Sequence, residues 1–219
     1  MGKRMKRILY LLVTILFALS LKAQTSQTES RKILDSASAA IRTGGGIKAD
    51  FTVKVFGEDR LLEEMQGSIR LKEEKLLLKT DDAVIWFDGK TQWSYWAETE
   101  EVNVTNPTTE ELQSINPYVL LSAYQNGFEC QKGSKTQFQG KPVNEVLLTA
   151  IADNRQDVLR ARLYILKETY QLVFIEMEQQ GGNRSEITVT GYQTKKNYDD
   201  ALFRFNKKEY PNAEIIDLR

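Results

Sequence analysis

The chain has 219 residues, of which 41% are apolar, and its 30 basic residues equal its 30 acidic ones. It contains no histidine, which excludes a Ser-His-Asp triad, a Cys-His pair and any histidine-ligated metal site. Cys130 is its one cysteine, so no intramolecular disulfide can form, and we expect a buried small side chain rather than a reactive thiol.

The first 23 residues have the layout of a secretory signal peptide. Four basic residues precede an apolar run over residues 8–19, which is too short to span a membrane comfortably. We expect cleavage after Ala23 and a soluble, monomeric mature chain, residues 24–219, that forms a single domain. The signal holds five of the basic residues, so 25 remain against 30 acidic ones, a net charge of −5. This charge argues against binding of nucleic acid or anionic membranes.

An amphipathic helix is predicted between Ser30 and Arg42, where Ile33, Leu34, Ala37 and Ile41 recur at helical spacing before three glycines. From Phe51 onward the apolar residues alternate with polar ones, which is typical of antiparallel strands with one buried face. The later predicted strands include Leu159–Leu166, Tyr170–Glu178, Ser185–Tyr192, Leu202–Phe205 and Ala213–Ile216. We expect about ten or eleven strands in one sheet, more than a flat sheet usually holds without curling or splitting.

Asp88-Gly89 separates two apolar runs, residues 84–87 and 93–96, and predicts a two-residue hairpin turn. A helical pair is predicted after it, inserted between strands. Thr108 and Glu111 have the spacing of a capping box, and Pro117 suits the first turn of a second helix.

Three segments together resemble a known family. They are Gly67-Ser68-Ile69-Arg70-Leu71-Lys72, the hairpin Phe87-Asp88-Gly89-Lys90-Thr91-Gln92-Trp93-Ser94-Tyr95, and Glu101-Val102-Asn103-Val104-Thr105. Together with the end of the chain and the order of elements, they are similar to the outer-membrane lipoprotein carrier (LolA-like) family. The resemblance implies an α+β fold, an unclosed and strongly curved antiparallel half-barrel with an N-terminal helix and a helical lid. It also implies a periplasmic chaperone that takes acylated lipoproteins from an inner-membrane ABC transporter and passes them to an outer-membrane acceptor, without enzymatic activity or cofactor.

On that basis we expect the concave face to form a lipid-binding cavity beneath an apolar lid. The predicted cavity residues are Phe51, Val53, Ile69, Leu71, Leu76, Leu78, Ile85, Phe87, Trp93 and Tyr95, and the predicted lid residues are Tyr118, Leu121 and Tyr124. The same residues could instead be ordinary core, because a buried apolar stripe looks the same facing a cavity or a packed helix. One position departs from the family: Glu73-Glu74 replaces an Arg-Pro pair whose arginine holds the lid.

Three other functions remain open at this stage. The same fold could serve a sensor that detects lipids or lipoproteins, or a carrier of another amphiphile. A hydrolase could use paired carboxylates, for example Glu63-Glu64 or Asp81-Asp82. Adjacent residues on a strand point to opposite faces, however, so these doublets are expected to be solvated surface and not a catalytic or metal site.

Overall fold

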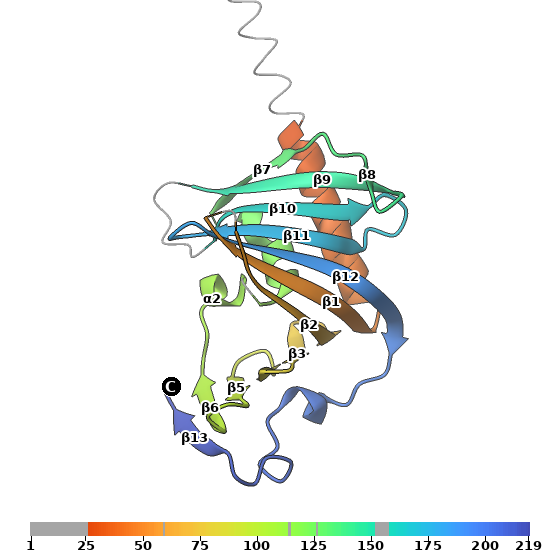
Figure 1. Ribbon diagram of the computed structural model, residues 1–219. Coiled ribbons are helices and arrows are strands. Elements are labelled where there is room, and N and C mark those ends of the chain that lie inside the picture. The colour runs from red at the N-terminus through yellow and green to blue at the C-terminus, as the bar shows by residue number, and fades with distance from the viewer. Residues whose placement is uncertain (1–25, 59, 114, 126, 152–157) are drawn as a thin grey trace, which may run out of the picture.

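Strand pairing organises the whole molecule. In the computed structural model, which describes residues 26–58, 60–113, 115–125, 127–151 and 158–219, thirteen strands form one sheet (Figure 1). The predicted signal peptide and its cleavage after Ala23 lie outside these residues. The strands are β1 (Gly46–Gly57), β2 (Arg60–Lys72), β3 (Lys75–Thr80), β4 (Ala83–Phe87), β5 (Gln92–Trp96), β6 (Glu101–Thr105), β7 (Phe128–Lys132), β8 (Gln137–Phe138), β9 (Lys141–Ala150), β10 (Val158–Leu166), β11 (Leu172–Gln179), β12 (Asn183–Lys196) and β13 (Glu214–Asp217).

The sheet order is β13-β6-β5-β4-β3-β2-β1-β12-β11-β10-β9-β7, with β8 attached to β9. All described pairs are antiparallel except β13 with β6, which is parallel. The predicted antiparallel, unclosed sheet is therefore confirmed, with more strands than the ten or eleven expected. The sheet curves strongly, so that β3 to β6 turn away from the upper strands (Figure 1).

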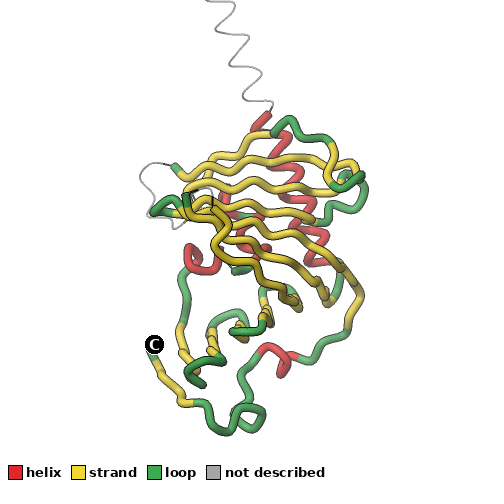
Figure 2. Tube along the Cα trace, in the orientation of Figure 1, coloured by secondary structure: helices red, strands yellow, loops and turns green. Residues whose placement is uncertain are grey.

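The N-terminal helix and the helices that follow β6 lie on the inner face of this curve. The N-terminal helix, residues 26–43, runs behind the upper strands (Figure 2). The helical insert, our name for residues 109–125, holds α2 (Thr109–Gln113), α3 (Pro117–Leu121) and the 3-10 helix η1 (Ala123–Gln125). As expected, Thr108 and Glu111 form a capping box: the Thr108 amide donates to Glu111 Oε2 at 2.7 Å, and the Glu111 amide donates to Thr108 Oγ1 at 3.3 Å. None of the described helices has the length and apolar character needed to cross a membrane.

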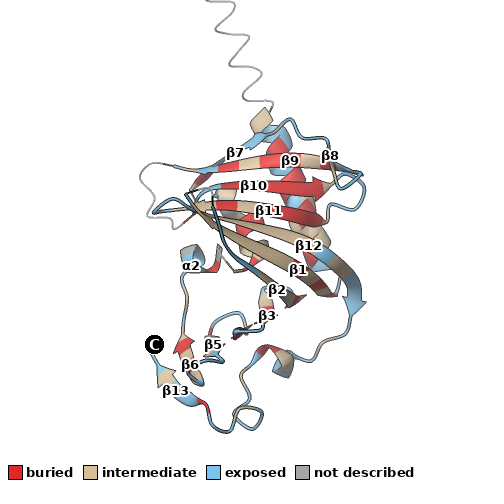
Figure 3. Ribbon diagram, viewed as in Figure 1, coloured by how far each residue is buried: buried red, intermediate tan, exposed pale blue. Residues whose placement is uncertain are grey.

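The main core lies between the N-terminal helix and the inner face of the sheet. Ile33, Leu34, Ala37 and Ile41, the predicted apolar stripe, are all buried there, in one cluster with side chains of β7, β9, β10 and β11. Burial is densest along β9, β10 and β11 (Figure 3). Cys130 belongs to this core and is 1% exposed, and burial raises the pKa of its thiol, as expected for a structural cysteine.

The end of the chain packs on the outer face instead. We call residues 198–217 the C-terminal strap; it contains the 3-10 helix η2 (Asp200–Phe203) and β13. Its Phe203, which is fully buried, and its Tyr210 cover Trp86. The rings of Trp86 and Tyr210 pack edge to face, with their centroids 5.4 Å apart. The predicted strand Leu202–Phe205 is wrong, because Asp199 accepts a hydrogen bond from the Ala201 amide and caps a helical turn there.

Candidate functional site: an apolar cavity under the helical insert

A cavity of about 270 Å³ lies between the inner face of the sheet and the helical insert. Its wall comes from β1, β2, β3, β11 and β12, and the N-terminal helix and the insert close it from the other side. The side chains that line it are Ile41, Ile47, Ala49, Phe51, Val53, Met65, Ile69, Leu71, Leu78, Thr80, Ile115, Asn116, Pro117, Leu120, Leu172, Ile175, Met177, Gln179, Ser185, Ile187, Val189 and Tyr192. Not one of these described residues is acidic or basic, so the cavity suits an apolar ligand.

Polarity and exposure change along the cavity. Thr80, Gln179 and Ser185 stand near the strand ends beside the β3–β4 and β11–β12 turns, and all three are partly exposed. At the opposite end, Ile47 and Leu71 are almost fully buried. The cavity therefore opens toward the polar end and is closed and apolar at the other, an arrangement that fits an amphiphile with its head group at the opening.

Five of the ten predicted cavity residues line this cavity: Phe51, Val53, Ile69, Leu71 and Leu78. Leu76 and Phe87 are buried in the main core on the same face, and Ile85 packs against that core, but none of the three lines the cavity. The predicted set thus identifies the inner face over β1 to β4 and extends too far along it.

Trp93 and Tyr95 lie on the opposite face, and their placement in the cavity is corrected. Both pack in the outer aromatic clusters beneath the C-terminal strap. The pairing explains the error: Phe87 faces Gln92 across β4 and β5, so the residues that share its face in β5 have even numbers. The loop between them has four residues, 88–91, so the predicted two-residue turn at Asp88-Gly89 is wrong. Loops of two and of four residues both pair Phe87 with an even-numbered residue, so either length places Trp93 on the outer face.

The insert presents different residues to the cavity from those predicted. Ile115, Asn116, Pro117 and Leu120 line it. Leu121 is instead fully buried in the main core. The prediction chose one apolar stripe of the insert, and the structure turns the adjacent stripe toward the cavity.

Tyr124, another predicted lid residue, does not line the cavity either. Tyr124 contacts the N-terminal helix, where its hydroxyl donates to Asp35 Oδ1 at 2.6 Å. Burial, followed by the hydrogen bond to Asp35, raises the pKa of Tyr124. Tyr118 lies in α3, but its side chain is outside what the structure describes. At η1 the insert is therefore fastened to the N-terminal helix.

A hydrogen bond that sequence reasoning missed holds the insert over the cavity. Asn116 is 1% exposed, and its Nδ2 donates to the carbonyl oxygen of Glu74 at 3.1 Å. Glu74 lies in the β2–β3 turn, where Glu73-Glu74 replaces the Arg-Pro pair of the family. The contact to the insert is thus made by a backbone carbonyl of the turn and a side chain of the insert. Asn116 stands directly before Pro117, and this was its only signal in the sequence.

The fold and the cavity together define a class of protein: an open half-barrel that shelters an apolar cavity beneath helices. Residues 19–181 match the family described as outer membrane lipoprotein carrier protein LolA, and the chain belongs to this family. It is 24% identical, over 98% of its own length and all of the relative's, to an outer-membrane lipoprotein carrier protein of Psychromonas ingrahamii.

Solved structures show the same fold at low sequence identity. An uncharacterized conserved protein from Thermus thermophilus superposes with a TM-score of 0.59 at 13% identity, covering 86% of this chain and 99% of the other. A putative outer membrane lipoprotein-sorting protein domain from Vibrio parahaemolyticus gives a TM-score of 0.50 at 10% identity, covering 84% and 99%.

Proposed function

We propose that this protein is a periplasmic carrier that binds the acyl chains of lipoproteins in the cavity and ferries them from the inner to the outer membrane. The observation that carries the proposal is the uncharged cavity between the concave face of the sheet and the insert. Membership of the lipoprotein carrier family supports it. In this proposal the protein works as a monomer, receives cargo from an inner-membrane lipoprotein-releasing ABC transporter, and delivers it to an outer-membrane acceptor.

The free energy of burying acyl chains is so large that a carrier must offset part of it to release its cargo. Burial of each methylene contributes about 0.8 kcal/mol, so one chain of roughly sixteen carbons could gain on the order of 12 kcal/mol. Several chains held so well would not be released, given how steeply affinity grows with free energy. A carrier without an energy source therefore needs a competitor for its cavity. Ile115 and Leu120 supply one, because the ligand must displace their apolar surface from the wall.

The volume supports the same mechanism. The cavity of about 270 Å³ is below the roughly 300–1,000 Å³ of sites that hold one small-molecule ligand. A triacylated anchor is larger than such a ligand, so it enters only when the insert moves away from the sheet.

The test compares two neighbouring positions on β1 whose side chains point to opposite faces. Val53 lines the cavity, and Thr52 does not. Val53→Phe should fill part of the cavity and weaken binding of a synthetic triacylated lipopeptide roughly tenfold or more, because each excluded methylene costs about 0.8 kcal/mol. Thr52→Phe should leave the affinity unchanged.

The measurement is fluorescence titration, with the same peptide lacking its acyl chains as the negative ligand. Equal affinities for Val53→Phe and wild type, or equal binding of the unacylated peptide, would remove the cavity as the cargo site. Tight binding of a free fatty acid without binding of the lipopeptide would favour a carrier of another amphiphile.

A further inference from the structure

The turn between β2 and β3 contains two unfavourable features. Lys72 and Lys75 are direct cross-strand partners on either side of it, and like charges placed opposite each other destabilise a strand pair. Glu73, the first residue of the turn, has a φ of 56°, a conformation that side chains with a Cβ rarely adopt. A turn with these two features depends on support from outside the hairpin.

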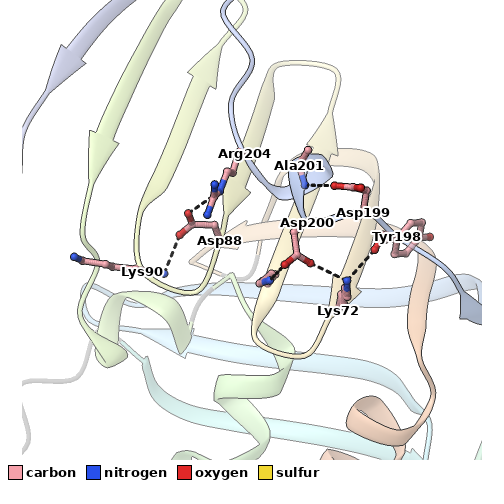
Figure 4. A network of polar contacts seen from close by, with 9 residues as sticks. Lys72, Asp88, Lys90, Tyr198, Asp199, Asp200, Ala201 and Arg204 are labelled. Atoms are coloured by element: carbon pink, nitrogen blue, oxygen red, sulfur yellow. Dashed lines mark hydrogen bonds and ion pairs between the residues drawn. The ribbon is translucent and has the colours of Figure 1, made fainter.

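Support on the outer face comes from the C-terminal strap (Figure 4). The two oxygens of Asp200 divide between the lysines: Oδ1 is 2.7 Å from Lys72 Nζ, and Oδ2 is 2.6 Å from Lys75 Nζ. Lys72 also donates to the carbonyl oxygen of Tyr198 at 2.9 Å. The hydrogen bonds to Asp200, that from Lys72 first, lower the pKa of Asp200 to about 2, so the carboxylate is charged at neutral pH.

The inner side of the same turn holds the helical insert. Asn116 donates to the Glu74 carbonyl, and its own carbonyl accepts the amide of Leu120, one of the cavity-lining residues of α3. The position of this part of the insert over the cavity thus depends on where the Glu74 carbonyl stands. Strap and insert are far apart in the sequence and attach to the same turn.

We propose that Asp200 is a positioning residue for the cavity: by bridging Lys72 and Lys75 it fixes the Glu74 carbonyl that holds Asn116, and so couples the C-terminal strap to the helical insert. When the bridge is lost, the two lysines repel, the turn shifts, and the insert leaves the sheet more often. The consequence for ligand exchange rests on the proposed function, whereas the coupling itself belongs to the free protein.

The primary test is hydrogen–deuterium exchange of the free protein. Asp200→Asn should raise exchange of the amides in α2 and α3 by about two- to fivefold, the range by which an exposed ion pair shifts an equilibrium. Asp217→Asn is the matched control, because Asp217 is an exposed strap carboxylate with a pKa also lowered to about 2, and its partner is Arg219 instead of the turn. It should leave the exchange of the insert unchanged.

A double-variant cycle decides whether the effect passes through Asn116. Asn116→Ala should raise exchange in α2 and α3, and adding Asp200→Asn should raise it no further. Two results would overturn the proposal: exchange of the α2 and α3 amides in Asp200→Asn that equals wild type, or an exchange increase in the double variant that equals the product of the two single increases. A purely structural role of Asp200 would raise exchange in the strap alone.

The same variants are then mixed with the fluorescent fatty acid cis-parinaric acid in a stopped-flow instrument. Association and release should both be faster in Asp200→Asn, by about the factor seen in exchange. Rates equal to wild type, despite faster exchange of the insert, would show that the insert does not gate the cavity. If the exchange results hold and no variant, wild type included, binds the fatty acid or the lipopeptide, the coupling stands and the proposed function fails.

Discussion

Gly67 determines the shape of the cavity wall where β1 and β2 meet. It is the cross-strand partner of Phe51, whose ring covers it. A Cβ at this position would lie 2.5 Å from Cζ of Phe51 and 2.8 Å from the carbonyl oxygen of Lys79 on β3. The second neighbour is backbone, which cannot rotate away, so this strand position has room for hydrogen only.

We therefore expect Gly67→Ala to lower the free energy of unfolding by about 1–3 kcal/mol, as overpacking usually does. Gly57→Ala, on the neighbouring strand β1, is the control. Its Cβ would lie 2.8 Å from Cδ1 of Leu62 and 3.7 Å from Oδ1 of Asn183, and both are side-chain atoms that can move away. Urea unfolding of both variants measures the difference. Equal stabilities would mean that the Phe51 ring and the β3 backbone move aside without cost.

The apolar pattern of the helical insert predicts that a helix is present but not which of its faces lines the cavity. The spacing of Tyr118 and Leu121 predicted a lid, and a helical insert stands at the expected place. Pro117 and Leu120 have the same spacing one residue earlier, and they line the cavity. In a helix of five residues two apolar stripes are equally regular, and only tertiary packing decides which of them faces the sheet.

Leu120 and Leu121 offer a matched pair for testing the competing role of the insert. Both are buried, 1% and 0% exposed, and Leu120 lines the cavity whereas Leu121 does not. Each change to alanine should cost about 2–5 kcal/mol of stability. Leu120→Ala should also tighten binding of an acyl ligand, because less apolar surface must be displaced, and Leu121→Ala should leave the affinity of the folded protein unchanged.

Fatty acid titration well below the melting temperature of either variant measures this difference. Weaker binding by Leu120→Ala would show that this side chain grips the ligand directly. In that case the insert would be part of the binding site and would not compete with the ligand.

At the scale of the whole molecule, the sequence pattern indicates the curved sheet but not what covers its outer face. Alternation indicated which strands have one apolar and one polar face. The apolar stripe of Ile33, Leu34 and Ala37 indicated that the N-terminal helix covers the inner face. Strands β4 and β5 carry aromatic side chains on both faces of the sheet, so alternation could not show which of these side chains face the cavity. Their partner is the C-terminal strap, which is distant in sequence, and its segment Leu202–Phe205 resembled one more strand.

Cargo binding should change the insert and the sheet in opposite directions. In the proposed function, a cavity of about 270 Å³ takes up a triacylated anchor only if the insert moves away from the sheet. We expect saturating lipopeptide to raise hydrogen–deuterium exchange in α2 and α3 and to lower it in β1 and β12. A single-chain fatty acid should raise exchange in α2 and α3 less than the lipopeptide does. Protection of the insert by the lipopeptide would mean that the helices close on cargo.

The central position of β1 has a consequence for the order of folding. Strands β2 to β6 pair in succession, and so do β9 to β12. Among the described strands, these two halves of the sheet meet only through β1 and its partner β12. β1 begins at residue 46, and β12 ends at residue 196. The seam that joins the halves therefore has to wait for nearly the whole chain, and contacts of such sequence separation make folding slow. We therefore expect the local hairpins of each half to pair before β1 joins β12.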